Sequence, residues 1–234
     1  MLDAAFDALK KYDWGTDRAP LAPIEDAVTA SHGKEDARKD LESRLLVALK
    51  SDISRDAKDY VCRKLTIVGT GVSAATLAGL LGDKDHAHMA RYALERIQAS
   101  EAGQALRDAL AKLSGNLKIG VISSLAARRD AAAVPAISAS LVDSDVAVAR
   151  AAAIALGEIG SADAAKTLQA ATPSAAEAKQ AVVDAQLACA ESLLAADKKT
   201  EAMAIYKSLA GEQQSKLVRL AATRGLLACV GKKS

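Results

Sequence analysis

Leucine residues recur along this chain at intervals close to 31 residues, and this period limits the fold more than any other feature of the sequence. The series runs Leu65, Leu94, Leu125, Leu156, Leu187 and Leu227, with nearly equal steps until the last. Such a period is typical of stacked helical hairpins, in which each hairpin buries its apolar stripe against the next. The longer last step indicates an insertion near Lys198 and Lys199.

A second alignment supports the repeat. Residues 64–77 align with residues 155–168 without a gap, so that Gly69-Thr70 falls on Gly160-Ser161. The match crosses a whole junction between two helices. We therefore expect these two junctions to be equivalent positions of the repeat.

The composition predicts helices almost throughout. Alanine accounts for 54 of the 234 residues, and it combines the best helix propensity with a side chain small enough for close helix packing. Apolar residues recur with helical spacing, and breaks rich in Gly or Asx arrive at regular short intervals. The expected helices are 2–12, 18–31, 34–50, 54–68, 73–82, 86–98, 101–113, 116–128, 131–142, 145–159, 162–171, 174–195, 199–210 and 214–230.

Two of these helices show their buried stripes directly. Val134, Ile137 and Leu141 would face one side of the helix over 131–142. The next helix would bury Val148, Ala152, Leu156 and Ile159. We also expect Leu65, Leu94, Leu125, Leu156 and Leu187 to be buried.

The stretch from Val148 to Gly160, which reads VARAAAIALGEIG, resembles a HEAT repeat of the short bacterial type, including the phycobilisome-lyase-like variety. It follows Val134-Pro135-Ala136-Ile137 and an Asp143-Ser144-Asp145 turn, and residues 218–226 are similar. The resemblance is most specific over 54–172 and returns at 216–231. It implies an all-α fold, a right-handed α-solenoid (α-α superhelix) of about seven antiparallel helical hairpins. It also implies that the second helix of each pair lies on the concave face.

We expect a single HEAT-like domain over residues 1–234. Residues 1–50 would be N-terminal capping helices, similar to the leading helices of HEAT modules in large multidomain bacterial proteins. Regular repeats would occupy 51–172. Residues 173–234 would form less regular repeats, in part similar to a tetratricopeptide hairpin.

The charge balance does not favour nucleic acid as a partner. The chain has 31 Lys and Arg against 29 Asp and Glu, and only 3% of its residues are aromatic. Nucleic-acid binding needs cations gathered on one face, and single strands also need aromatic stacking platforms. No apolar run approaches the roughly 20 residues of a membrane span. The N-terminus lacks the features of a secretory signal, so the chain as it stands is expected to be cytoplasmic, or exported if it is processed from a longer protein.

The sequence has no recognisable catalytic motif. Ser123-Ser124 has no motif around it, and Gly69-Thr70-Gly71 lacks the strand and the Lys-Ser/Thr pair of a phosphate loop. We therefore expect neither an enzyme nor a cofactor. The resemblance to lyase-type HEAT repeats leaves a tetrapyrrole lyase-like enzyme as an alternative, although no cysteine, histidine or aromatic cluster supports it.

Histidine and cysteine residues offer little for a metal. His86 and His88 are two residues apart, and on a helix they would point about 200° apart, so they could chelate together only from an extended segment. We expect them to lie at the start of a helix. Cys62, Cys189 and Cys229 lie in apolar stretches, where cysteine behaves as a small hydrophobic residue.

Three of the six aromatic residues, Phe6, Tyr12 and Trp14, lie in the first fourteen residues. They could form a recognition patch. The other interpretation is that they cover the open end of the first repeat, which would otherwise expose its apolar face.

Arg128 and Arg129 break the repeat pattern. Three residues after each of the other leucines of the series, the chain has an apolar residue. Four residues after them it has glycine, glutamine or glutamate. After Leu125, both positions are arginine. They could complement the helix dipole and pair with Asp130, the expected cap of the next helix. Alternatively, they could contact an anion or an acidic partner, which makes Arg128 and Arg129 the candidate partner-binding residues.

The sequence thus favours a non-catalytic, monomeric scaffold that binds another protein on its concave face. A nucleic-acid-binding HEAT protein is the alternative. A mixed-charge groove would favour the first function, and a continuous positive groove the second.

Overall fold

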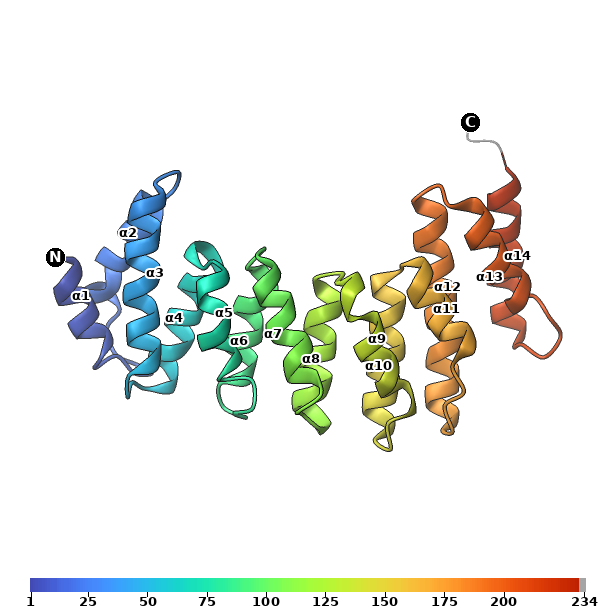
Figure 1. Ribbon diagram of the computed structural model, residues 1–234, viewed down its shortest axis with the longest axis horizontal. Coiled ribbons are helices and arrows are strands. Elements are labelled where there is room, and N and C mark those ends of the chain that lie inside the picture. The colour runs from blue at the N-terminus through green and yellow to red at the C-terminus, as the bar shows by residue number, and fades with distance from the viewer. Residues whose placement is uncertain (232–234) are drawn as a thin grey trace. The chain divides into compact units, whose positions relative to one another are not determined.

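The computed structural model describes residues 1–231 and is all-α over these residues (Figure 1). It contains fourteen α-helices, three short 3-10 segments and no strand in the described part of the chain. The prediction of a helical repeat fold is confirmed. The chain divides into two compact units, residues 1–113 and 114–234. The single domain expected over 1–234 stays a prediction.

The first unit is built of helices that pack with their neighbours in sequence and with the helix two places along. Thus α3 packs on α4, α4 on α6 and α5 on α7, as a stack of helical hairpins requires. The bounds are α1 Leu2–Leu9, η1 Ala19–Leu21, α2 Ala22–Ala30, α3 Glu35–Lys50, α4 Arg55–Val68, α5 Gly71–Ala78, α6 Ala87–Arg96 and α7 Ser100–Leu110.

The second unit has the same kind of helix packing within itself. Here α8 packs on α10, α10 on α12 and α12 on α14, while α9 packs on α11. The bounds are α8 Gly115–Ala127, η2 Ala131–Ala133, α9 Val134–Ser138, η3 Ala139–Val142, α10 Val146–Ile159, α11 Ala162–Ala170, α12 Ala176–Ala195, α13 Lys199–Leu209 and α14 Lys216–Val230.

Side-chain caps explain several helix starts. The hydroxyls of Ser54, Thr70, Ser161 and Ser215 and the carboxylate of Asp145 each accept a hydrogen bond from a backbone N–H in the first turn of the helix that follows. Such caps satisfy donors that have no partner inside the helix. The local sequence therefore accounts for these boundaries.

The helix predicted over 131–142 is broken into three pieces. A 3-10 turn precedes α9, and a second 3-10 turn follows it. Pro135 has no N–H to donate toward Ala131, and its ring would collide with that carbonyl in a continuous α-helix. The predicted stripe of Val134, Ile137 and Leu141 is nevertheless buried, as is the stripe predicted for α10.

The leucine register holds over four repeats and then fails. Leu65, Leu94, Leu125 and Leu156 are completely buried, as predicted. The prediction for Leu187 is wrong, because this side chain is only half-buried. Leu227, the last leucine of the series, is 70% exposed.

Cys189 takes the place predicted for Leu187. It is fully buried, and its Sγ donates to the carbonyl oxygen of Leu156 at 3.4 Å. The repeat step from Leu156 is therefore 33 residues rather than 31. Two residues on an α-helix correspond to a rotation of about 200°, so this small slip turns Leu187 away from the core.

Polar side chains of α3 hold the turn between α4 and α5. The Nε and Nη2 of Arg38 donate to the carbonyls of Val68 and Gly69, each at 2.8 Å. One turn further along α3, the buried Glu42 carboxylate accepts from the backbone N–H of Thr70 at 2.7 Å and from the hydroxyls of Thr70 and Ser73. The last carbonyls of α4 and the N-terminus of α5 are thereby satisfied by one neighbouring helix.

Candidate functional site

A groove in the second unit is the candidate site, because six charged side chains line it. It has a volume of about 630 Å³ and is lined by α10, α12 and the C-terminal end of α8. Its lining residues are Ala126, Ala127, Arg129, Arg150, Ile154, Gly157, Glu158, Glu177, Gln180, Ala181, Asp184, Ala185, Ala188, Glu191 and Ser192.

Small residues form the floor of this groove and set the distance between its walls. A Cβ atom on Gly157 would lie 3.0 Å from the Cα of Ala185, so a larger residue at this position would require α10 and α12 to move slightly apart. Ile154 also lines the groove, with 49% of its surface exposed. The floor is therefore apolar and accessible.

The walls of the groove carry a row of carboxylates. Glu177, Asp184 and Glu191 follow one another at intervals of seven residues, and all three are exposed on α12. That spacing places them along one face of the helix. Glu158 from α10 adds a fourth carboxylate.

Two arginines, Arg129 and Arg150, also line the groove, so its six charged side chains sum to −2. Among residues 1–231, none of these six charges lies within ion-pair distance of an opposite charge. The two arginines offset the four carboxylates only in part, and the groove keeps a net negative charge. Burial and, after it, the Glu191 carboxylate raise the pKa of Tyr206, on the adjacent α13, to about 12.

The predicted pair Arg128 and Arg129 is separated by the structure. Arg128 is the half-buried C-cap of α8 and does not line the groove. Arg129 is exposed, lines the groove and adopts a left-handed conformation with φ +49°. The Arg129 N–H donates to Ala126, and the Asp130 N–H donates to Leu125, which is the hydrogen-bond pattern of a Schellman motif.

Two sequence predictions about this helix end are confirmed. Arg129 occupies the position at which α10 has Gly160, itself left-handed with φ +63°. The Asp130 side chain accepts from the N–H of Ala132 at 3.0 Å and so caps the 3-10 turn that follows.

The histidines and cysteines occupy structural positions. His86 is the N-cap residue of α6, and its Nδ1 lies 2.8 Å from the Asp83 carboxylate. Within residues 1–231 there is no group of three or more His, Cys, Asp or Glu residues that could hold a metal. All three cysteines are buried, and burial raises the thiol pKa to about 12 for Cys62 and about 11 for Cys189.

The aromatic residues near the N-terminus do not act as one cover. Phe6 and Tyr12 are half-buried, and the ring centroids of Tyr12 and Tyr60 are 6.2 Å apart. Trp14 is 87% exposed. The interpretation that all three cover the end of the first repeat is therefore wrong for Trp14.

The carboxylate row of α12 was not predicted from the sequence. The seven-residue spacing of Glu177, Asp184 and Glu191 was available as a signal. It could not be assigned to a face while Leu187 was expected to be buried, because that register places the core on a different side of the helix.

Comparison with known proteins identifies the repeat. Residues 104–186 match the family of HEAT repeats. This segment of the chain is built of HEAT repeats. The segment matched as HEAT repeats includes most of α7 and extends into the first half of α12.

Comparison with solved structures gives two matches at low sequence identity, each with a TM-score below 0.5. One is an engineered protein, 18% identical, with a TM-score of 0.44 over 96% of this chain and 68% of that chain. The other is human deoxyhypusine hydroxylase in complex with glycerol, 16% identical, with a TM-score of 0.39 over 97% of this chain and 95% of that chain. No curated protein matches in sequence. None of the helices within residues 1–231 is long and apolar enough to cross a membrane.

Proposed function

We propose that this chain is a non-catalytic scaffold of HEAT repeats that binds a basic segment of a partner protein in the groove of α8, α10 and α12. The observation that carries the proposal is the row of Glu177, Asp184 and Glu191. These carboxylates share one exposed face of α12 and have no ion-pair partner within residues 1–231. Exposed carboxylates without an ion-pair partner are available to the cations of a partner.

The floor of the groove supports a peptide-like partner. Lys and Arg side chains can lay their aliphatic stems on apolar surface while their charged ends reach carboxylates. Ile154 and the alanines of α12 supply that surface beside the acidic row. The groove therefore suits a segment that alternates basic and small apolar residues.

Arg129 and Arg150 would determine how the partner lies. Arg129, which follows the end of α8, and Arg150 of α10 line the groove together with the α12 carboxylates, and they repel cations placed near them. A basic segment would keep its cations over α12 and place acidic or neutral groups near the arginines. We retain Arg129 as a partner-binding candidate, and Arg128, which lies outside the groove, is not part of this proposal.

The same charges argue against the nucleic-acid alternative. A phosphate backbone would meet four carboxylates and only two cations in this groove, and nucleic-acid binding depends on the reverse balance. The predicted concave face, monomeric state and cytoplasmic location remain predictions.

The test compares two triple variants of the full chain as baits for proteins of the source cell. Glu177→Gln, Asp184→Asn and Glu191→Gln together remove the acidic row. Asp163→Asn, Glu201→Gln and Glu212→Gln are a matched control, because they remove the same number of exposed carboxylates from the second unit outside the groove. A partner retained by the wild type should be retained by the control and released by the groove variant.

The retained partner is then cut into overlapping peptides to locate the bound segment. A basic segment whose affinity falls about tenfold with the groove variant and also falls with added salt supports the proposal. Equal retention by both variants, or a bound segment without basic residues, would contradict it.

A further inference from the structure

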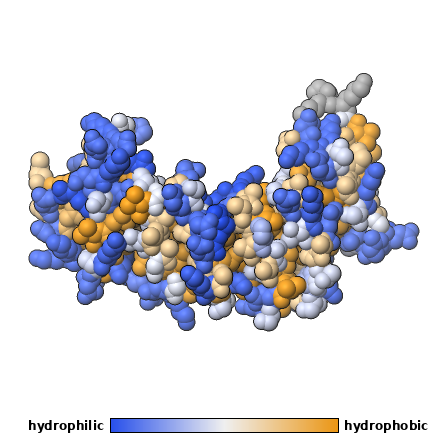
Figure 2. Space-filling view, viewed as in Figure 1, coloured by the Kyte–Doolittle hydropathy of each residue, from blue (hydrophilic) through white to orange (hydrophobic). Residues whose placement is uncertain are grey.

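Helix α14 carries the largest group of exposed apolar side chains in the described part of the chain. Twelve large hydrophobic residues are exposed over residues 1–231, and four of them lie on this one helix. Leu217, Leu220, Leu227 and Val230 are 79%, 56%, 70% and 75% exposed, and we refer to them as the α14 stripe. Figure 2 shows hydrophobic surface along the outer side of α14.

The opposite side of α14 is the one that holds the helix in place. Val218, Ala222 and Cys229 are buried there, where α14 packs on α13 and α12. Gly225 lies so close to the Tyr206 ring that a Cβ would be 2.3 Å from it. Since this side is filled, the α14 stripe packs on no other helix among residues 114–231.

The stripe has the spacing of an interface between two helices. Leu220 and Leu227 are seven residues apart, and Thr223 and Val230, also exposed, continue the alternation of three and four residues. This spacing lets Leu220, Leu227 and Val230 face one partner helix, whereas Leu217 lies to one side of them, in line with Arg224. Arg219 and Arg224 lie on the two edges of this group, at the positions that form ion pairs across such interfaces.

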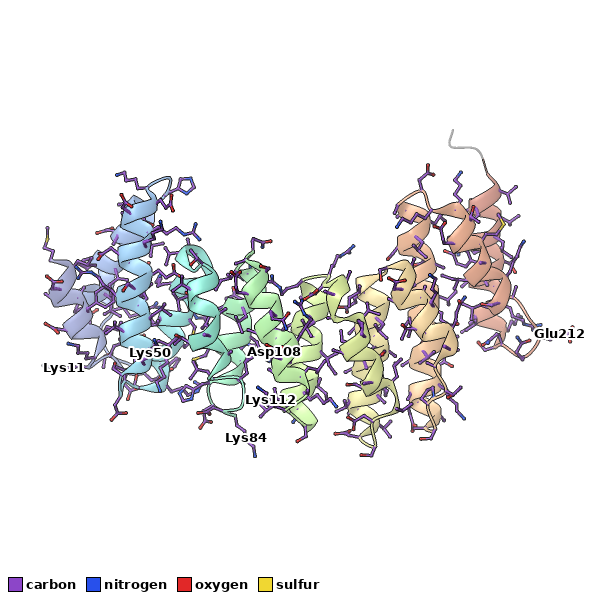
Figure 3. The ribbon with its side chains drawn as sticks, in the orientation of Figure 1. Lys11, Lys50, Lys84, Asp108, Lys112 and Glu212 are labelled. Atoms are coloured by element: carbon purple, nitrogen blue, oxygen red, sulfur yellow. The ribbon has the colours of Figure 1, made fainter. Side chains whose placement is uncertain are left out.

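The charges on α14 are all positive. Lys216, Arg219 and Arg224 are its only charged residues, and within residues 1–231 none of them lies within ion-pair distance of a carboxylate. The Nε of Arg219 is buried and has no hydrogen-bond acceptor among the described residues. Glu212, in the loop before α14, projects away from the helix (Figure 3).

We propose that the α14 stripe is a second docking surface, and that its occupant is an acidic amphipathic helix of another protein. Such a helix would place apolar residues against Leu220 and Leu227 and carboxylates against Arg219 and Arg224. The apolar contact would provide affinity, and the cations at both edges would select an acidic partner over a basic one.

A second copy of this chain fits the stripe poorly. If two α14 helices packed antiparallel, each edge arginine would face its own counterpart, and if they packed parallel, Arg219 would face Arg224. Both arrangements place like charges next to each other. Coiled coils use the same repulsion to exclude wrong pairings.

A membrane surface also fits less well than a helix. Helices that lie in a membrane interface present a broad apolar face with aromatic residues. The exposed side of α14 is interrupted by Thr223 and Arg224, and α14 contains no aromatic residue. We therefore treat membrane binding as an outcome that would contradict the proposal.

The experiment uses the full chain and two fluorescent peptides, each a designed amphipathic helix of about three heptads. Both carry leucine along one seam. The acidic peptide has Glu at the flanking positions, and the basic peptide has Lys. We expect fluorescence anisotropy to show that the chain binds the acidic peptide at least about tenfold more tightly than the basic one.

Variants of α14 separate the two contributions. Leu220→Ser with Leu227→Ser should weaken binding of the acidic peptide by about tenfold or more. Val142→Ser with Val146→Ser, two exposed valines outside α14, is the matched control and should leave binding unchanged. Arg224→Glu should weaken the acidic peptide and strengthen the basic one, a reversal that loss of folding cannot produce. Circular dichroism confirms that each variant is folded.

Several results would overturn the proposal. These are absence of binding to either peptide, equal binding of the two peptides, or binding of the acidic peptide that survives the double leucine variant. Leucine-dependent flotation with vesicles of phosphatidylserine and phosphatidylcholine would assign the stripe to a membrane instead. Leucine-dependent dimerisation in sedimentation would assign it to a second copy. Binding of the acidic peptide that persists in the Glu177, Asp184 and Glu191 variant would support the proposal, because it shows that the α14 stripe binds independently of the groove.

Discussion

The junction between α4 and α5 in the first unit and that between α10 and α11 in the second are equivalent in the repeat, yet they are held differently. In the first unit, Arg38 and Glu42 of α3 bind the last carbonyls of α4 and the N-terminus of α5. Gly69, at this junction, has an extended conformation with φ −62° and ψ 145°.

At the second junction, residues of α10 and α11 and of the turn between them make most of the hydrogen bonds. Gly160 is left-handed, its N–H donates to Leu156, and the Ser161 hydroxyl caps α11 by accepting from the N–H of Ala164 at 3.1 Å. The neighbouring α12 contributes the Cys189 thiol and packs Ser192 against Gly160. Aligned glycines thus do not imply one backbone conformation, because the side chains of the adjacent helix decide how each turn is satisfied.

The largest expected effect concerns the core beside the second junction. Leu156→Ala should lower the free energy of unfolding by about 2 to 5 kcal/mol, because it leaves a cavity in a filled core. Leu187→Ala should cost less than about 1 kcal/mol, because that side chain is only half-buried. Urea unfolding followed by circular dichroism compares the two variants. Equal losses in the free energy of unfolding would mean that Leu187 is buried like Leu156, as the 31-residue period predicts.

The polar clamp of the first junction should be the next most sensitive feature. Glu42→Ala should cost about 1.5 to 3 kcal/mol, because the Thr70 N–H and the Thr70 and Ser73 hydroxyls lose a charged acceptor in a buried site. Glu35→Ala, on the exposed side of the same helix, is the matched control and should leave the free energy of unfolding almost unchanged. Similar losses in chemical unfolding would mean that the clamp does not stabilise the junction.

The left-handed glycine of the second junction can be tested in the same assay. Gly160→Ala should cost about 1 to 2 kcal/mol from the backbone alone, and more because its Cβ would lie 2.7 Å from Ser192. Gly33→Ala, at φ +72° with no atom within 4 Å of its Cβ, isolates the backbone contribution. The difference between the two losses measures the packing of α12 on this junction, and a difference of zero would contradict that packing.

The smallest effect is expected at Arg129, which occupies the glycine position of α8. Arg129→Gly should be more stable than Arg129→Ala by about 1 kcal/mol, because alanine retains the cost of the left-handed conformation and glycine does not. This order is the reverse of the order in the interior of a helix. Thermal unfolding of both variants measures it, and an alanine variant as stable as the glycine variant would show that φ is negative in solution.

Much of the fold could be predicted because its signals are local. Each of the fourteen expected helices has a counterpart, although the segment over 131–142 is broken around Pro135. The caps at Ser54, Asp145 and Ser161 lie within three residues of the groups they satisfy. Signals of such short range depend on the sequence alone.

The candidate site was predicted only in part. The break in the repeat pattern at Arg128 and Arg129 predicted a binding site at the end of α8, and Arg129 lines the groove there. The acidic row of α12 was missed, because two extra residues in the repeat step to α12 rotate the whole helix by about 200° relative to the expected register. A count of residues between repeats cannot reveal which of them lengthen a loop.

The sequence by itself determined an all-α chain of short antiparallel hairpins, since alanine-rich periodicity and capping residues act over a few neighbouring positions. Only the tertiary structure decided which side of α12 and α14 faces solvent, and that Glu42 of α3 holds the start of α5, two helices further along the chain. Those outcomes depend on how whole helices rotate and pack against one another. Packing is a contact between distant segments, and no local pattern in either segment specifies it.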